Sequence, residues 1–508
     1  MTAKLLALPL VVLVMGIGAL AMFLPAIYAS ITDDHATARA FFYSGVLFLV
    51  LFSMVAVATS SLPVRRQGRG HLISILATFL IIPAMLAVPF AEVVRDTRFV
   101  SAYFEMVSSL TTTGATLFPP DRLPPALHLW RAQVGWLGGF FVWVTAVAIL
   151  APMNLGGFEV RGATAQIGRG ATERGSVTSV ADFSNRLARY AVMLLPIYLG
   201  LTLTLWALLY MAGDSALTAL CHAMSVISTS GISPEAGLAS AEGGSGVAGE
   251  AIMAIFLLFA LSRVTFAAEE RPHGWRSLRD DGELRIGLLF VCVLPTLMAL
   301  RHWIGAIELR TEDEFSALFE TLWGAAFTTV SFLTTTGFES VYWDTARGWS
   351  GLQAPGLILM GLAVFGGGVA TTAGGVKLLR VYALYKHGLR ELEKLVQPNS
   401  IGGSGIMERR IRRQGAYVAW VFFMLFAISI AGFMLLFALT GIDFDAVMVL
   451  TIAGLTTTGP LTGAVATAPV DLAQIGDGAR AVFAAAMVVG RLETLAIIAL
   501  LNPDFWRG

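Results

Sequence analysis

The chain has 508 residues, of which 56% are hydrophobic and only 13% are charged, and its mean hydropathy is +0.74. A typical soluble domain is about a quarter charged and less than half apolar, so the composition argues against a water-soluble globular enzyme. Lys and Arg number 34, as do Asp and Glu, and this zero net charge argues against nucleic acid as a partner. The two cysteines, Cys221 and Cys292, cannot form a disulfide framework or a CxxC motif. The composition indicates an integral membrane protein.

Apolar runs long enough to cross a membrane recur along the chain. A transmembrane helix needs ~20 mostly apolar residues, and about ten such runs lie near 5–28, 40–60, 73–93, 132–152, 190–212, 249–268, 285–304, 353–380, 415–440 and 480–501. The first run could instead be a cleaved signal peptide, because Lys4 precedes it and Ala29-Ser30 would suit a peptidase. Its apolar core is longer than the roughly 7–15 residues usual in signal peptides. We therefore expect ten crossings.

Basic residues gather in segments that share one side of the membrane if all ten runs cross it. These segments are 65–69, 161–189, 271–285 and 377–413, whereas Arg263 and Arg491 fall inside apolar runs. Cytoplasmic loops carry the excess of Lys and Arg. The pattern predicts a multi-pass protein with both termini in the cytoplasm.

Four short hydroxyl-rich loops, each ending in glycine, repeat along the chain at residues 111–114, 228–231, 334–337 and 456–459. Each loop follows a short apolar run and lies between two long ones. The unit is therefore a span, a short re-entrant helix, a loop and a second span. We predict an all-α integral membrane protein with a two-helix addition at 1–70 and four pseudo-symmetric pore repeats at 71–185, 186–283, 284–400 and 401–508.

The composition of these loops suits a dehydrated cation. An ion that crosses hydrocarbon must exchange its water for oxygens held at similar distances, and backbone carbonyls supply such oxygens without a formal charge. Hydroxyls can add ligands or brace the loop, while glycine lets the backbone turn its carbonyls toward one axis. One Thr-Thr-Thr-Gly is most often an ordinary loop or helix end, but four spaced copies favour a pseudo-tetrameric pore. The predicted ring is Thr112, Thr113, Gly114, Thr229, Ser230, Gly231, Thr335, Thr336, Gly337, Thr457, Thr458 and Gly459.

Four further motifs accompany the loops. They are Trp130-Arg131-Ala132-Gln133 with Trp136-Leu137-Gly138-Gly139, then Thr372-Ala373-Gly374-Gly375-Val376-Lys377 continuing to Arg380, then Gly490-Arg491-Leu492-Glu493, and finally Pro503-Asp504-Phe505-Trp506. Over essentially the whole chain, this pattern resembles the Trk/Ktr/HKT superfamily of potassium transporters. The two spans before the first repeat favour the TrkH-type membrane subunits, because Ktr-type subunits usually have only the four repeats.

The resemblance implies potassium uptake across a bacterial inner membrane through a gated, channel-like selectivity filter. Glycine in all four loops implies selectivity for potassium, which would be the transported ligand of a chain without a cofactor of its own. The resemblance also implies a cytosolic TrkA-type nucleotide-binding ring as regulator, and a homodimer with one pore per chain. Two segments depart from the family pattern, namely Val369-Ala370-Thr371-Thr372 and the fourth loop, where relatives often have an Asn-Val-Gly type. No GxxxxGK[ST] motif is present.

Glycines concentrate at residues 366–375, in the middle of an apolar run. Each glycine weakens a helix by about 1 kcal/mol relative to alanine, and broken backbone at membrane depth is tolerated only beside a cavity or protein. Our hypothesis is an intramembrane loop that blocks ions below the ring; the alternative is close helix packing through small residues. The predicted gate residues are Gly366, Gly367, Gly368, Thr371, Thr372, Gly374, Gly375, Lys377 and Arg491.

Arg491 is a positive charge inside an apolar run, where charges usually face a watery interior or a partner. Near the pore axis it would repel cations; alternatively, it forms an ion pair with a carboxylate from another span. Glu105 and His222 occupy corresponding places in the first two re-entrant helices. Glu105 could tune the field at the outer mouth or brace its loop through backbone amides, and we expect a structural role for His222. The basic segment 409–413 suits either anionic lipid or a cytosolic partner.

Two other functional classes remain to be weighed against a gated pore. A proton- or sodium-coupled potassium symporter needs a titratable or charged site near the midplane, and the predicted ring contains no carboxylate. A membrane-embedded enzyme needs a cluster of His, Asp or Glu with catalytic or metal-ligand spacing, which the sequence does not contain. The residues therefore favour a transporter that is not an enzyme.

Overall fold

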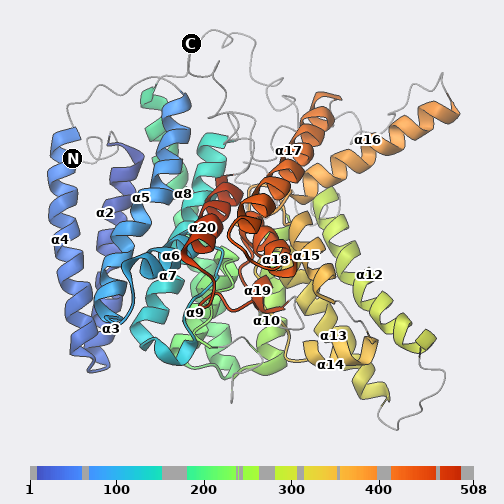
Figure 1. Cartoon of the computed structure of the whole chain (residues 1–508), viewed down its shortest axis with the longest axis horizontal. Helices are drawn as coiled ribbons and strands as arrows, with labels where there is room; N and C mark the ends of the chain where they lie inside the picture. The colour runs from blue at the N-terminus through green and yellow to red at the C-terminus, as the bar shows by residue number, and fades with distance from the viewer. Residues whose placement is uncertain are drawn as a thin grey trace.

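The computed structural model describes residues 8–59, 68–150, 180–235, 238, 244–262, 281–305, 314–351, 355–397, 413–464 and 470–492. Within these residues the regular structure is entirely helical (Figure 1). Seven helices are long and apolar enough to cross a membrane, and five shorter apolar helices accompany them. The prediction of an all-α integral membrane fold is confirmed.

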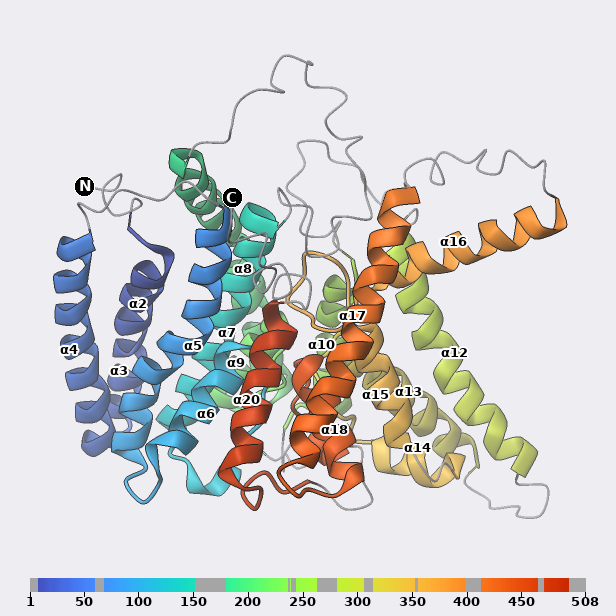
Figure 2. The ribbon, with the colours of Figure 1, turned by 45° about the horizontal axis from the view of Figure 1, so that its top comes forward.

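Three helices precede the first repeat: α2 (Leu10–Ala21), α3 (Phe23–Ile31) and α4 (His35–Thr59). The first two together form one candidate span, Leu10–Ile31, and α4 forms the second. These helices pack against α5 and α7 of the first repeat and lie at one flank of the molecule (Figure 2). The N-terminal two-helix addition therefore packs on the outside of the first repeat, away from the centre of the fold.

Each repeat contains a first helix, a short central helix and a second helix. The first repeat has α5 (Gly68–Val93), α6 (Phe99–Leu110) and α7 (Pro125–Thr145), and the second has α8 (Val180–Ala212), α9 (Ala216–Ser228) and α10 (Gly246–Leu258). The third has α12 (Gly282–Gly305), α13 (Glu314–Leu333), α14 (Trp343–Ser350) and α15 (Pro355–Phe365), and the fourth has α17 (Arg413–Ala438), α18 (Phe444–Leu455), α19 (Leu461–Ala464) and α20 (Asp477–Leu492). The first two repeats also contain three short helical turns: η1 (Pro120–Arg122), η2 (Ala146–Leu150) and η7 (Phe259–Leu261).

The repeats follow one another around a closed circle. The second helix of each repeat packs against the short central helix of the next: α7 on α9, α10 on α13, and α15 on α18. The circle closes because α20 of the fourth repeat packs back on α6 of the first. The four central helices are consequently linked to one another through the second helices of the repeats.

The predicted span 353–380 is broken, as its glycines indicate, and the predicted spans 249–268 and 480–501 extend beyond the described residues. The run predicted at 353–380 is interrupted, because α15 ends at Phe365 and α16 (Leu378–Val396) begins only after a non-helical segment. The run at 249–268 is helical to Leu261, and α20 is described to Leu492. Figure 2 shows α16 projecting away from the body of the molecule. α15 ends where the next residue, Gly366, adopts a left-handed conformation with φ of 70°.

Glycines allow the second helices to approach the ends of the central helices. A Cβ atom on Gly138 of α7 would overlap the carbonyl oxygen of Leu110, and one on Gly490 of α20 would overlap that of Leu455. Leu110 and Leu455 are the last residues of α6 and α18, so the first and fourth repeats share the same contact. Small residues of this kind let membrane helices pack closely.

We therefore expect Gly138→Ala to destabilise the protein by about 1–3 kcal/mol, the usual effect of overpacking. The measurement is the thermal unfolding temperature in detergent. Gly432→Ala is the matched control, because Gly432 lies in α17 with open space around its Cβ position, and alanine there should be neutral or stabilising by up to about 1 kcal/mol. Equal unfolding temperatures for the two variants would contradict the packing role of Gly138.

Candidate functional site

The four hydroxyl-rich loops share one backbone conformation at the ends of α6, α9, α13 and α18. The second residue of each loop is left-handed, with φ of 54° at Thr112, 51° at Thr229, 59° at Thr335 and 53° at Thr457. The N–H of the third residue donates to the carbonyl five residues earlier at 2.8–2.9 Å in all four loops. This is a helix C-terminal turn of the Schellman type. A β-branched residue is strained at positive φ. Because a threonine adopts this conformation in every repeat, the surrounding structure must enforce the conformation.

Hydroxyl groups hold each loop in this shape. The first residue's hydroxyl donates to the helix carbonyl four residues earlier, for instance from Thr111 to Val107 at 2.8 Å and from Thr456 to Ile452 at 2.7 Å. The hydroxyls of the first and third residues also contact each other, at 2.8, 3.0, 3.1 and 3.2 Å in the four repeats. The side chains of these two positions thus brace the loop. These hydrogen bonds fix where the two hydroxyl oxygens lie relative to the loop backbone.

The loops meet in a closed ring. A Cβ atom on Gly114 would overlap the carbonyl oxygen of Ser230, and one on Gly231 would overlap that of Thr336. Gly337 faces Pro460 of the fourth loop. The fourth loop returns to the first, because the Gly459 N–H donates to the Thr113 carbonyl at 2.6 Å. The twelve predicted ring residues therefore lie together at the centre of the molecule, as loops 1, 2, 3 and 4 in order.

The fourth loop departs from the other three at its glycine. Gly114, Gly231 and Gly337 have φ of 76°, 64° and 87°, whereas Gly459 is not left-handed. The expectation that every loop glycine supplies an unusual backbone angle is wrong for Gly459. Its role is close approach instead, since a Cβ atom there would collide with Ala115, which directly follows the first loop.

A cavity of about 650 Å³ opens on one side of the ring and is called the vestibule here. It is lined by the four loop glycines and by the segments that follow them. The carboxylates of Glu235, Glu339 and Asp471 and the guanidinium of Arg131 contribute to its wall. Burial, and next the nearby Asp344, raise the pKa of Glu339, and Arg347 opposes this shift. The excess of carboxylates favours cations over anions at the entrance to the ring.

Polar side chains nine residues before the loop glycine tie three central helices to the segments beyond the ring. In the first repeat Glu105 accepts the Leu117 N–H at 2.5 Å and pairs with Arg131 at 3.1 Å. In the second, His222 contacts the Ser233 hydroxyl at 3.0 Å. The bracing alternative considered for Glu105 from the sequence, and the structural role expected for His222, match this geometry.

The third repeat uses two groups for the same purpose. Thr328 accepts the Ser340 N–H at 3.2 Å, and the fully buried Glu250 of α10 accepts the Val341 N–H at 2.6 Å. Glu250 also accepts from Trp323 at 2.8 Å. Glu250 was not among the residues predicted from the sequence, although a lone carboxylate in the apolar run 249–268 was the available signal. It joins the second repeat to the third.

Residues 366–377, called the intramembrane loop from here on, lie against the ring on the side opposite the vestibule. The Gly374 N–H donates to the Thr335 hydroxyl at 2.7 Å, and the Thr372 hydroxyl lies 3.1 Å from that of Thr229. A Cβ atom on Gly374 would overlap the Thr456 carbonyl oxygen. The segment 372–374 therefore contacts the second, third and fourth loops at once.

The backbone of the intramembrane loop explains its glycines. Gly366 and Gly375 have φ of 70° and 76°, and a Cβ atom on Gly366 would overlap the Gly374 carbonyl oxygen. The two ends of the loop thus run side by side, with the Val376 N–H donating to the Val364 carbonyl at 2.9 Å. Lys377 (φ 81°) is buried and its ammonium donates to the Ala373 carbonyl. The predicted gate residues 366–368, 371, 372, 374, 375 and 377 all belong to this one compact turn.

Arg491 reaches the intramembrane loop from α20. Its guanidinium donates to the Thr372 carbonyl at 2.6 Å, and only 7% of the residue is exposed. A buried charge therefore lies on the side of the ring away from the vestibule, in contact with the segment that touches three loops. Other residues considered from the sequence, namely Arg263, Glu493, 409–412 and 503–506, lie outside the described residues.

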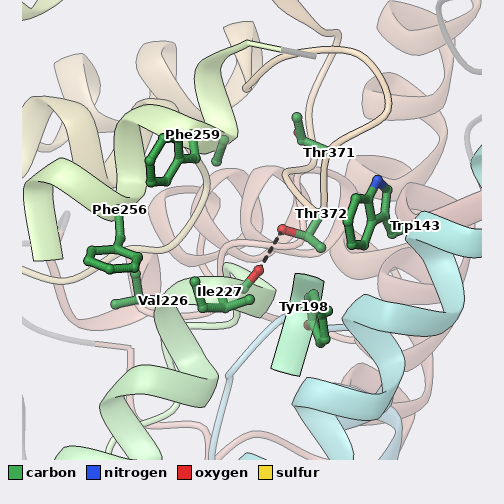
Figure 3. Close-up of a pocket in the computed structure, with 9 residues that line it drawn as sticks. Trp143, Tyr198, Val226, Ile227, Phe256, Phe259, Thr371 and Thr372 are labelled. Atoms are coloured by element: carbon green, nitrogen blue, oxygen red, sulfur yellow. Dashed lines mark hydrogen bonds between the residues drawn. The ribbon is translucent and has the colours of Figure 1, made fainter. Parts of the chain in front are cut away.

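A small cavity of about 20 Å³ lies beside the intramembrane loop (Figure 3). Trp143, Tyr198 and Phe259 line it together with Thr371 and Thr372. The Thr372 hydroxyl also contacts the Ile227 carbonyl at 3.3 Å, which Figure 3 draws as a dashed line. The loop is thus packed against apolar side chains of the first and second repeats on this flank, with room for about one water molecule.

Comparison with known proteins decides the family. A family model described as TrkH, a cation transport protein, matches residues 69–239 and 316–504. The chain belongs to the TrkH family. Among curated TrkH-family relatives, the Trk system potassium uptake protein TrkH of Escherichia coli (strain K12) is 30% identical over 491 residues, 96% of each chain. That of Halomonas elongata is 32% identical over 448 residues, 85% of this chain and 84% of the relative.

A solved TrkH-family structure matches the whole chain. The crystal structure of the potassium transporter TrkH from Vibrio parahaemolyticus aligns with a TM-score of 0.80 and 25% identity, covering 100% of both chains. The recognition of the TrkH type from the sequence is confirmed. With the candidate spans, it makes this TrkH-family chain a multi-pass membrane protein.

The pair between Glu105 and Arg131 yields a prediction for this TrkH-family site. Their side chains are 0% and 4% exposed, and removing one partner of such a pair leaves an uncompensated charge that costs about 3–5 kcal/mol. We expect Arg131→Met to lower the unfolding temperature markedly, whereas Glu105→Gln combined with it should restore part of the loss. Arg95→Met, in an exposed pair with Glu92, is the control and should change little. An Arg131→Met protein as stable as this control would contradict the bracing role.

Proposed function

We propose that this protein takes up potassium across a bacterial inner membrane through a gated, channel-like filter made by its four loops. The observation that carries the proposal is the closed ring, in which each loop lies against the next and the fourth bonds back to the first. The hydroxyls of the first and third loop positions are engaged within the loops. We propose that the backbone carbonyls of the loops are the main oxygens that replace the hydration shell of an ion.

Two observations support potassium as the transported ion. The relatives that share most of the chain are named potassium uptake proteins, and all four loops keep the glycine that the family resemblance links to potassium selectivity. The proposed filter residues are Thr112, Thr113, Gly114, Thr229, Ser230, Gly231, Thr335, Thr336, Gly337, Thr457, Thr458 and Gly459.

The intramembrane loop and Arg491 are proposed as the gate. Residues 372–374 lie directly against three of the four loops, so an ion leaving the ring on this side meets the loop. Arg491 adds a positive charge at the same place, which raises the energy of a cation there. Conduction then requires the loop to move away from Thr229 and Thr335.

Partners are part of the proposal. The family resemblance implies a cytosolic TrkA-type nucleotide-binding ring as regulator. In our proposal this ring moves the intramembrane loop. A homodimer is supported by α16, whose Tyr385, Leu392 and Leu395 are exposed on a helix that projects from the body. We place both termini in the cytoplasm, because the basic segments of the sequence share that side.

Substitution of a ring glycine tests selectivity. Gly114→Ser places a side chain where φ is 76° and where the Ser230 carbonyl lies, so the ring must distort. In reconstituted vesicles we expect the potassium-to-sodium permeability ratio to fall about tenfold, equivalent to about 1.4 kcal/mol. Gly463→Ser is the control, because Gly463 lines the vestibule with open space beside it.

The same vesicles distinguish a uniport pore from a coupled symporter. For the pore, the reversal potential follows the potassium gradient and is unmoved by changes of pH or sodium. A reversal potential that shifts with pH or with the sodium concentration would indicate proton- or sodium-coupled transport instead of a uniport pore. An unchanged permeability ratio in Gly114→Ser would contradict the filter assignment.

Removing the charge of Arg491 tests the gate. Arg491→Ala abolishes both the barrier charge and the bond to Thr372, so potassium flux without any cytosolic partner should rise at least about tenfold. Deletion of residues 366–368 should act in the same direction. Arg480→Ala is the control at the opposite end of α20, where the guanidinium bonds Ala473 instead. Flux that stays at the wild-type level in folded Arg491→Ala protein would reject the gate role.

A further inference from the structure

The intramembrane loop is held on its second side by residues that the ring does not use. The Val369 N–H donates to the carboxylate of Glu283 at 3.2 Å, and the Gly368 N–H donates to the Ala260 carbonyl at 2.9 Å. Glu283 belongs to the first turn of α12 and is fully buried. Ala260 belongs to η7, at the end of the second repeat. The loop is therefore attached to two different repeats.

These two attachment points are joined to each other. The Ser262 hydroxyl, one residue after η7, donates to the carboxylate of Asp281, and both residues are buried. The other oxygen of Asp281 accepts the Glu283 N–H at 3.1 Å, as an N-terminal cap of α12. A chain of hydrogen bonds thus runs from Ser262 through Asp281 and Glu283 to Val369.

The close fit at Gly368 shows how little movement this contact allows. A Cβ atom on Gly368 would lie 2.8 Å from the Leu261 carbonyl oxygen and 3.1 Å from the Glu283 carboxylate. Removing a hydrogen-bond partner from a buried polar group costs free energy. Separating the Glu283 carboxylate from the Val369 N–H therefore opposes movement of the intramembrane loop.

We propose that Ser262, Asp281 and Glu283 form a latch that holds the intramembrane loop closed, and that opening requires the ends of the second and third repeats to separate at the Ser262–Asp281 contact. All three are positioning residues, since they act on the loop and not on the ion. The proposal rests on the gate role of the loop proposed above. It assigns the site through which a regulator on this face acts: moving the second repeat relative to α12 pulls on residues 368 and 369.

The test measures potassium flux and the potassium-to-sodium permeability ratio of the full-length protein in vesicles without any partner. Glu283→Gln keeps an acceptor oxygen but removes the charge, and Ser262→Ala removes the donor to Asp281. We expect each variant to raise basal potassium flux about fivefold to tenfold with an unchanged permeability ratio. We expect the double variant to fall short of the product of the two effects, because both weaken one latch. The unchanged ratio separates a latch from a general loss of ring structure.

Thr78→Val is the matched control. Thr78 also carries a buried hydroxyl, which donates to the Ser74 carbonyl at 2.7 Å, but it belongs to α5 of the first repeat. Its flux should equal that of the wild type. The latch is rejected if Ser262→Ala and Glu283→Gln, both folded by their unfolding temperatures, keep wild-type basal flux. It is equally rejected if the control rises as much, or if the permeability ratio falls. Absence of potassium-selective flux in the wild type would instead reject the proposed function itself.

Discussion

Backbone carbonyl groups that end a helix inside a membrane need partners, and this requirement shapes the whole molecule. In hydrocarbon an unsatisfied polar group costs several kcal/mol, so the four central helices cannot simply stop in the bilayer. They end instead at one point, where each loop lies against the next. In the proposed filter, a cation at that point would satisfy the carbonyls that no N–H group reaches, and the carbonyls would replace the water that the cation has lost.

Maintaining this arrangement requires strained backbone in every repeat. A non-glycine residue at positive φ costs about 1–3 kcal/mol, and Thr112, Thr229, Thr335 and Thr457 all adopt it. The cost is offset by the paired hydroxyls within the loops and by buried groups that tie the flanking segments together, among them the pair of Glu105 with Arg131. The polar residues around the ring thus serve its geometry, which explains why so apolar a chain buries several carboxylates.

The two sides of the ring differ in a way that suits directed entry and controlled exit. The vestibule is open and carries more carboxylates than cationic groups. The opposite side is occupied by the intramembrane loop, with Arg491 and Lys377 buried in contact with its carbonyls. Carboxylates therefore outnumber cationic groups on the vestibule side of the ring, and buried cationic groups lie on the opposite side. This asymmetry arises from the third repeat, whose second helix breaks at Phe365, and from the fourth, which supplies Arg491.

Much of this fold could be predicted from the sequence because its signals are local. Long apolar runs, the repeated loops and the glycines at 366–375 each specify a nearby piece of structure, and the family motifs fixed the arrangement of the repeats. Long-range pairings carried no comparable signal. Nothing local indicates that Glu105 meets Arg131, that Glu250 of the second repeat braces the third, or that Glu283 reaches Val369. The non-left-handed Gly459 was also unpredictable, since its conformation follows from contact with the first loop and not from its own Thr-Thr-Thr-Gly sequence.

Anomalous scattering from crystals soaked in thallium or rubidium, both of which substitute for potassium, would most directly locate the ion. If the carbonyls of four loops surround a dehydrated cation, the strongest peaks will lie on the central axis, between the vestibule and Thr372. Each peak will then be within coordination distance of backbone oxygens from all four repeats. Peaks confined to the vestibule carboxylates, or contacted by only one or two loops, would contradict this arrangement.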